Sequence, residues 1–199
     1  MPGHPRTLDN KEQYGYTMAA HHCIPGNAAL KESKILKYIS ASKGTIVKNI
    51  GYNVNGAGNG IWLVGWYAVR AGNGNSPSAN TGWGALTGLP FREAYVMAVI
   101  RATGAQFHDT HATYSDNVRD VLDKVALHFD TNAKFFCDKC KEAAQQPGGK
   151  IPPPYGLNDR LDSFSGFLGG KLRGSTVKSW QLNRWCTSDT WESTMSKMV

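Results

Sequence analysis

The sequence predicts a mostly helical α+β domain with a few short strands. Apolar residues recur at helical spacing after His111. Residues with high β-propensity flank a stretch rich in Gly and Asn at residues 53–60. Hydrophobic residues make up 41% of the 199 positions, which is enough to bury a core. A chain of this length forms one domain, or one domain with a sizeable addition.

The first elements expected are an irregular arm and a helix. Residues 1–15 are polar and contain Pro and Gly, so they predict an N-terminal arm without regular structure. Apolar positions between residues 27 and 40 recur at helical spacing, and Asn27 is a candidate N-cap for that helix.

Strands are expected on both sides of the stretch rich in Gly and Asn, over residues 45–52 and 61–69. Repeated Asn and Gly supply the backbone conformations that a tight connection requires. Residues 70–90 contain many Gly, Asn and Ser without a period, which predicts a long loop. Residues 91–101 favour a helix, with a buried strand as the alternative.

The clearest helix follows His111. Its apolar stripe, spaced i, i+4, i+7, i+8 and i+11, consists of Tyr114, Val118, Val121, Leu122 and Val125. Asp109 or Thr110 can cap the start of this helix. A second helix is expected over residues 132–145, because Pro147 and two glycines follow it.

Residues 147–199 are expected to form a Pro/Gly linker and a Trp-rich extension that packs on the core. The linker at 147–156 contains three consecutive prolines, and the remaining residues, about 43, are too few to fold alone. The spacing of Trp180, Trp185 and Trp191 favours positions in the core. Stacking on nucleic-acid bases is the alternative.

The balance of charge favours an anionic partner. There are 22 Lys and Arg against 15 Asp and Glu, which gives a formal net charge of +7. Nucleic acid, an acidic membrane face and an acidic protein all fit this excess. No run approaches the roughly 18 apolar residues of a membrane helix, so no membrane partner is expected. No apolar segment of a classical signal peptide opens the chain, so export would use another route or a longer chain.

Four of the six histidines fall in two pairs. His108 and His111 lie at a helix entrance with a spacing that brings two imidazoles close enough to share a metal ion. His21 and His22 are adjacent, so on an extended segment their side chains point to opposite faces. One of them would then bind metal while the other acts as a general base. Each histidine taken singly also fits an ordinary surface or core position.

Three motifs together resemble one family. Ala20-His21-His22 is followed by Ile24-Pro25, residues 55–63 read N-G-A-G-N-G-I-W-L, and residues 111–118 read H-A-T-Y-S-D-N-V. In this order, over roughly residues 16–126, they resemble the AHH nucleases of the HNH/endonuclease VII superfamily. That family occurs as toxin domains of bacterial polymorphic toxins and secretion-system effectors. The resemblance implies a nuclease domain at 16–146.

The resemblance also implies a ββα-metal core, the HNH or His-Me finger, embedded in the mostly helical domain. By position, His21, His108 and His111 match ligands of one divalent ion, which can be Mg²⁺, Mn²⁺, Ni²⁺ or Zn²⁺. His22 matches the general base. Asn59 matches a central asparagine that steadies the hairpin and the base, although Asn-Gly is also a common hairpin-turn dipeptide.

One departure from the family pattern concerns the segment after the N-G-I-W-L strand. The family has a proline and a short connection there, whereas here Val64 follows Leu63 and about 40 residues precede His108. The insertion, at about 65–107, would contact substrate, contact a partner or cover the core.

The remaining histidines and cysteines are expected to be structural. His128 fits a packed position at a helix end, and His4 lies in the arm. Cys137 and Cys140 have zinc-knuckle spacing without a second close pair, and Cys23 and Cys186 lie far away. Free thiols are therefore favoured, with a structural zinc as the alternative.

The function expected is a metal-dependent endonuclease that cuts DNA with little sequence specificity. The resemblance implies an antibacterial toxin or effector that is delivered into the cytoplasm of a target cell and neutralised by a cognate immunity protein. Candidate phosphate contacts are Lys31, Lys34, Lys37, Arg101, Arg119 and Lys124. The alternatives are an RNase toxin that uses the same site and a non-catalytic, zinc-stabilised module that binds nucleic acid.

Overall fold

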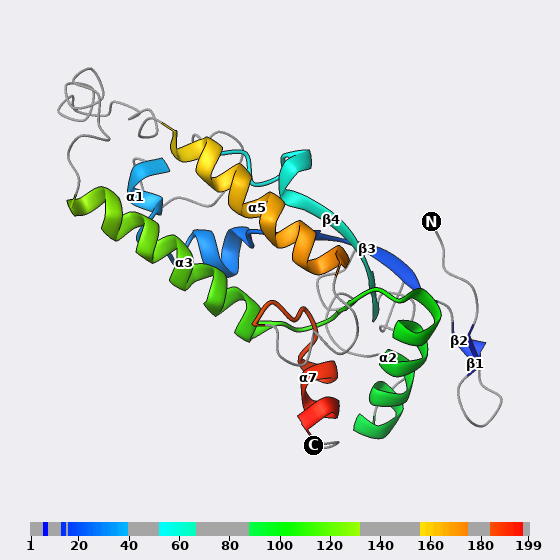
Figure 1. Ribbon diagram of the computed structural model, residues 1–199. Helices are drawn as coiled ribbons and strands as arrows, with labels where there is room; N and C mark the ends of the chain where they lie inside the picture. The colour runs from blue at the N-terminus through cyan, green and yellow to red at the C-terminus, as the bar shows by residue number, and fades with distance from the viewer. Residues whose placement is uncertain are drawn as a thin grey trace. The chain divides into compact units, whose positions relative to one another are not determined.

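The computed structural model describes residues 6–7, 13–14, 16–39, 52–66, 88–131, 156–174 and 184–196 (Figure 1). Within these ranges the chain is a mixed α+β protein with a small three-stranded sheet and mostly helices. Packing divides the chain into two units. The first comprises residues 1–21, 62–113 and 171–199, and the second comprises residues 22–61 and 114–170.

Most of the three-stranded sheet belongs to the first unit. It consists of β3 (Thr17–His22), β4 (Gly60–Gly65) and β5 (Phe107–His108), in the order β3-β4-β5. β5 runs parallel to β4, with Val64 opposite Phe107 and Gly65 opposite His108. A separate pair of short antiparallel strands is formed by β1 (Arg6–Thr7) and β2 (Gln13–Tyr14), so the expectation that the arm at 1–15 lacks regular structure is wrong at these residues.

The core of the first unit lies between the sheet and two helices, α2 (Leu89–Thr103) and α7 (Asp189–Ser196). Its buried members are Val64, Tyr95, Val96, Val99, Ile100, Phe107, Cys186 and Trp191. The helix expected over residues 91–101 is thereby confirmed as α2. It ends at Gly104, whose φ of 66° is accessible to glycine at little cost. Trp185 and Trp191 are buried, as expected, whereas Trp180 lies outside the described residues.

The second unit contains η1 (Gly26–Leu30), α1 (Leu36–Ile39), η2 (Ala57–Asn59), most of α3 (Ala112–Thr131) and most of α5 (Leu157–Gly174). The stripe predicted for α3 is confirmed by Tyr114, Val118 and Leu122, which are fully buried, whereas Val121 and Val125 are half-buried. α1 lies along α3 in Figure 1, and an ion pair of 2.6 Å joins Lys37 of α1 to Asp130 of α3.

The single helix expected over residues 27–40 is wrong. Residues 26–30 form the wider turn η1, whose start is flanked by Pro25 rather than capped by Asn27, and the chain becomes α-helical again only at Leu36. The interruption has a visible cause. The backbone N–H of Lys34 donates to the Asp123 carboxylate of α3 at 2.7 Å, so a side chain of another helix takes a donor that a continuous helix would use.

The strand expected over residues 61–69 is shorter in the structure, where β4 ends at Gly65. Tyr52 lies in a bend, and the rest of the strand expected at 45–52 falls outside the described residues. The neighbour of β4 is instead β3, and Cys23 just after β3 donates its N–H to the carbonyl of Asn59 just before β4, at 2.9 Å. The two strands therefore run antiparallel.

Other expected elements lie outside the described residues. They are most of the arm at 1–15, most of the loop at 70–90, the helix at 132–145 and most of the linker at 147–156. The loop expected at 70–90 is wrong at residues 89 and 90, which belong to α2. Within the described part of the insertion, α2 and β5 are regular elements, and both contribute to the core of the first unit.

Candidate metal centre

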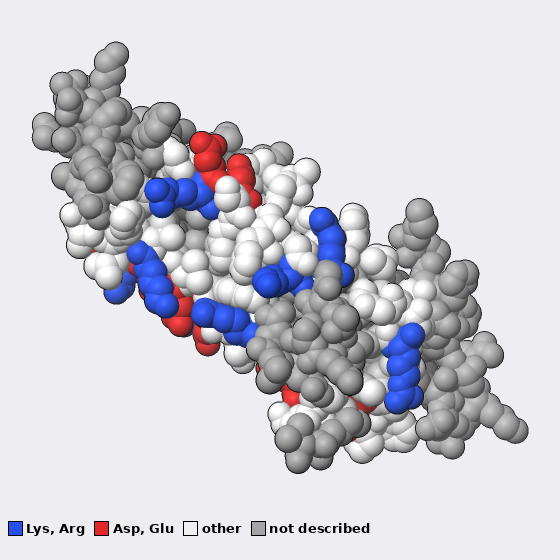
Figure 2. All heavy atoms as spheres, in the orientation of Figure 1, with Lys and Arg blue, Asp and Glu red and all other residues white. Residues whose placement is uncertain are grey.

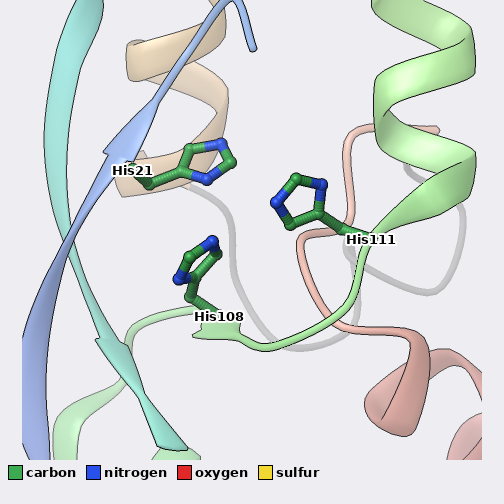
Figure 3. Close-up of side chains that lie close together, drawn as sticks. All are labelled: His21, His108 and His111. Carbon is green, nitrogen blue, oxygen red and sulfur yellow. The ribbon is translucent and has the colours of Figure 1, made fainter. Parts of the chain in front are cut away.

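Three histidines from different parts of the chain meet in the first unit. His21 comes from β3, His108 from β5 and His111 from the residue before α3, and their rings face one another in Figure 3. The ring centroid of His21 lies 4.8 Å from that of His108 and 5.0 Å from that of His111. The centroids of His108 and His111 are 5.2 Å apart. The three nitrogen atoms that can bind a metal ion all lie within 4.8 Å of one another.

Local structure explains why these side chains converge. Alternation along β3 turns His21 toward the interior, where the side chain is 3% exposed. The parallel register with β4 fixes His108 opposite Gly65, which has no side chain to occupy the adjoining space. His111 immediately precedes α3, so the start of that helix determines its position.

Burial favours the neutral imidazole form of His108 and His111. It lowers the pKa of His108 to about 4, and the nearby His111 adds to this effect. Burial also lowers the pKa of His111, although a backbone hydrogen bond and the charge of Asp189 act in the opposite direction. A neutral imidazole keeps a lone pair on one ring nitrogen, which is the form that binds a metal ion.

The three residues fit a divalent ion. All three donors are imidazole nitrogens, which suit transition metals such as Zn²⁺ and Ni²⁺. The Nδ1 atom of His108 is buried and makes no hydrogen bond to any described residue, so an ion would satisfy it. Three protein ligands also leave a coordination position open for a substrate oxygen, as catalytic sites require.

His22 occupies the opposite face of β3, as the adjacency of the two histidines predicts. Its side chain is exposed, and its Nε2 atom lies 3.0 Å from the Oδ1 atom of Asn55. When Nε2 carries the proton and donates to Asn55, Nδ1 has the free lone pair. Sequence reasoning missed this role of Asn55, although the residue opens the motif at 55–63.

Asn59 is a buried cross-link, with a side chain that is 1% exposed. Its Oδ1 accepts the N–H of Ile24 at 2.8 Å, and its Nδ2 donates to the carbonyls of Ile24 at 3.1 Å and Val54 at 2.8 Å. The hydroxyl of Ser165 on α5 lies 3.0 Å from the same Oδ1. The side chain thus ties the segment after β3 to the loop before β4, which is more than a turn position requires.

The candidate phosphate contacts are surface residues. Arg119 is half-buried and pairs with Asp116 at 2.8 Å, and Lys37 pairs with Asp130. The fully exposed candidates are Lys31, Lys34, Arg101 and Lys124. On the face shown in Figure 2, Lys and Arg side chains are scattered over the described surface, with Asp and Glu beside several of them. Their arrangement does not single out one of them as a substrate contact.

For the remaining histidines and the cysteines, burial distinguishes packed from exposed positions where the structure describes them. His128 is exposed on the last turn of α3, so the packed position expected for it is wrong. Its ring lies beside that of Phe129. Cys23 and Cys186 are buried free thiols, as expected. His4, Cys137 and Cys140 lie outside the described residues.

Comparison with known proteins identifies a family. Residues 5–146 match a family model described as a nuclease family of the HNH/ENDO VII superfamily with conserved AHH. The matched range contains all three histidines of the cluster together with His22 and Asn59. The same comparisons found no match among the curated proteins and none among the solved structures.

Proposed function

The chain belongs to the AHH nuclease family of the HNH/ENDO VII superfamily, and we propose that it is a metal-dependent endonuclease that cuts DNA with little sequence specificity. The observation that carries this proposal is the cluster of His21, His108 and His111. Its nitrogen atoms lie within 4.8 Å of one another in the part of the chain that the structure describes. A nuclease family implies a nucleic-acid substrate, and superfamily members use divalent metals.

Each residue of the site has a separate task in this proposal. His21, His108 and His111 hold one divalent ion, which when bound neutralises charge on the phosphate and on the leaving oxygen. His22 accepts the proton of the attacking water, and Asn55 orients its ring. Asn59 keeps the segment after β3 in place through both backbone groups of Ile24.

We assign β3, β4 and α3 to the ββα-metal core of the superfamily. Two features support this assignment. β3 and β4 are antiparallel neighbours, and α3 begins at the residue after His111. The helix α2 is then an addition within the insertion at about 65–107, which ends at β5. The nuclease domain at 16–146 and the extension at 147–199 stay part of the proposal.

DNA is the proposed substrate. Little sequence specificity is expected, because a site built on one ion and phosphate contacts reads the backbone of a duplex, which carries no direct sequence information. RNA offers the same phosphodiester group, so the RNase reading is separated from the DNase reading by experiment. A zinc-stabilised module without catalysis would need a closed set of four protein ligands, whereas the described cluster has three.

The biological setting proposed is competition between bacteria. The toxin domain would enter the cytoplasm of a rival cell, and a cognate immunity protein would neutralise it in the producing cell. The net charge of +7 supports an acidic inhibitor, because complementary charge speeds association and selects partners. Co-expression with the product of the neighbouring gene should yield a stable complex, and its failure to do so would count against this setting. No described helix has the length and apolar character needed to cross a bilayer.

The experiment that tests the nuclease is plasmid nicking by the purified chain with Mg²⁺, Mn²⁺, Ni²⁺ or Zn²⁺, against EDTA. We expect cutting that requires metal and is abolished in His22→Ala and His108→Ala. The matched control is His128→Ala, which removes an exposed imidazole from α3 and should leave cutting unchanged.

Total RNA incubated in parallel separates the substrates. Cutting of RNA alone would replace the DNase with an RNase at the same site. Intact DNA and RNA with every metal, while the chain still binds them, would overturn the catalytic proposal in favour of a binding module.

A further inference from the structure

The loop of residues 106–110, which carries His108 and directly precedes His111, is tied to a segment near the carboxyl end of the chain. Residues 106–110 and residues 184–196 both belong to the first unit, and hydrogen bonds join them. The family match ends at residue 146, so the C-terminal partner of this loop lies outside the matched range.

Thr187 makes most of these hydrogen bonds. Its side chain is fully buried, and its backbone N–H donates to the Oε1 atom of Gln106 at 3.1 Å. Its hydroxyl lies 2.8 Å from the carbonyl of Phe107 and 3.2 Å from Oε1 of Gln106. Its carbonyl accepts the N–H of Asp109 at 3.2 Å. One residue thus holds the positions immediately before and after His108.

The neighbours of Thr187 extend and anchor the contact. The N–H of Asp189 donates to the carbonyl of Thr110 at 2.8 Å, next to His111. Ser188 caps α7 by accepting the N–H of Trp191 at 3.1 Å on its hydroxyl oxygen. Trp191 is 2% exposed and belongs to the same core as Phe107, so the segment is fixed at its far end.

The loop has little structure of its own to hold the two histidines. β5 is only two residues long, and its pairing with β4 covers Phe107 and His108 alone. Strands this short are marginal without further contacts. Hydrogen bonds from residues 187–189 add to this pairing, because they reach the carbonyls of Phe107 and Thr110 and the N–H of Asp109.

We propose that Thr187 is a positioning residue of the metal centre, which holds the loop of residues 106–110 so that His108 and His111 converge on His21. This inference rests on the proposed function, in which the three histidines bind a divalent ion. Thr187 touches neither the ion nor the substrate. It acts through Gln106, Phe107 and Asp109, and its loss should weaken metal binding more than it weakens the fold.

The test measures metal binding directly, by titrating the full chain with Co²⁺ and recording its visible absorption. Thr187→Val keeps the shape of the side chain but places a methyl group against the carbonyl of Phe107. We expect the affinity for Co²⁺ to fall by about tenfold, as is common when a residue that orients metal ligands is lost. Raising the metal concentration should restore most of the cutting, and Thr187→Ser, which keeps the hydroxyl, should bind Co²⁺ like the wild type.

Thr194→Val is the matched control. Thr194 is also buried on the C-terminal segment, but its hydroxyl donates within α7, to the carbonyl of Thr190 at 2.7 Å. Thermal unfolding of the metal-free variants compares the cost to the fold. If the wild type binds Co²⁺ and cuts DNA, equal Co²⁺ affinities of Thr187→Val and Thr194→Val would overturn this inference alone. A wild type that neither binds Co²⁺ nor cuts nucleic acid would overturn the proposed function, and this inference with it.

A second pair of variants covers the case in which Thr187→Val does not fold. Asp189→Pro removes the N–H that binds Thr110, at the first position of α7, where proline is well tolerated. Asp189→Ala removes the same carboxylate and keeps the N–H. We expect weaker Co²⁺ binding for the proline variant than for the alanine variant, and equal binding would contradict the inference.

Discussion

Asn59 illustrates at the scale of one residue how the candidate site is held in shape. Every polar atom of its amide is used, since Oδ1 accepts from Ile24 and Nδ2 donates to two carbonyls. A buried amide whose hydrogen-bonding atoms are all paired cannot be replaced without cost, because an isosteric group with a different pattern of donors does not fit its partners.

Asn59→Asp should therefore destabilise the chain although it hardly changes its shape. The new carboxylate would have no N–H for the carbonyls of Ile24 and Val54 and would place an oxygen against them. We expect a loss of about 1–3 kcal/mol in the free energy of unfolding, measured by urea denaturation. Asn53→Asp is the control, because Asn53 is exposed and its side-chain Oδ1 accepts the N–H of Asn55, and aspartate retains this oxygen. Equal stability of the two variants would contradict the structural role of Asn59.

The sequence indicated the histidines of the site and Asn59, but not the roles of Asn55 and Thr187. His21, His22, His108 and His111 were predictable because their spacing and the family motifs mark them, and Asn59 because it matches the central asparagine of the family. Asn55 and Thr187 were not singled out. Asn55 is an ordinary loop asparagine in the sequence, and Thr187 acquires its role only through contacts 80 and 81 positions away along the chain.

Elements were predictable where a long apolar period decides the structure. α3 has 20 residues and a clear stripe, so its existence followed from the sequence. The segment 27–39 has the same kind of period, but the Asp123 carboxylate takes the N–H of Lys34 and interrupts the helix. β5 has two residues and pairs with a strand some 40 positions earlier, which no local pattern could indicate.

The stripe of α3 predicts a contrast between two leucines on one helix. Leu122→Ala should cost about 2–5 kcal/mol of unfolding free energy, because Leu122 is fully buried and its loss leaves a cavity. Leu127→Ala should cost little, because that side chain is 60% exposed. Chemical denaturation of the two variants measures the difference. Similar losses in both would mean that α3 packs through a different face.

On the scale of the whole molecule, the excess of basic residues predicts strong dependence on salt. Each phosphate contact contributes a slope of about −0.9 to a plot of the logarithm of the DNA-binding constant against that of the salt concentration. With a net charge of +7 we expect a clearly negative slope, measured by fluorescence anisotropy with the His22→Ala variant and duplex DNA. Affinity that does not change with salt would show that the charge serves another partner.

The hydrogen bonds between Thr187 and the loop before α3 also have an evolutionary consequence. Gln106 and Thr187 are 81 positions apart, yet neither keeps its buried partner if the other is replaced by an apolar residue. The two positions should therefore co-vary among relatives that share the C-terminal segment. A recombination event that exchanged the C-terminal segment alone would separate the pair, so we expect the loop of residues 106–110 and this segment to be inherited together.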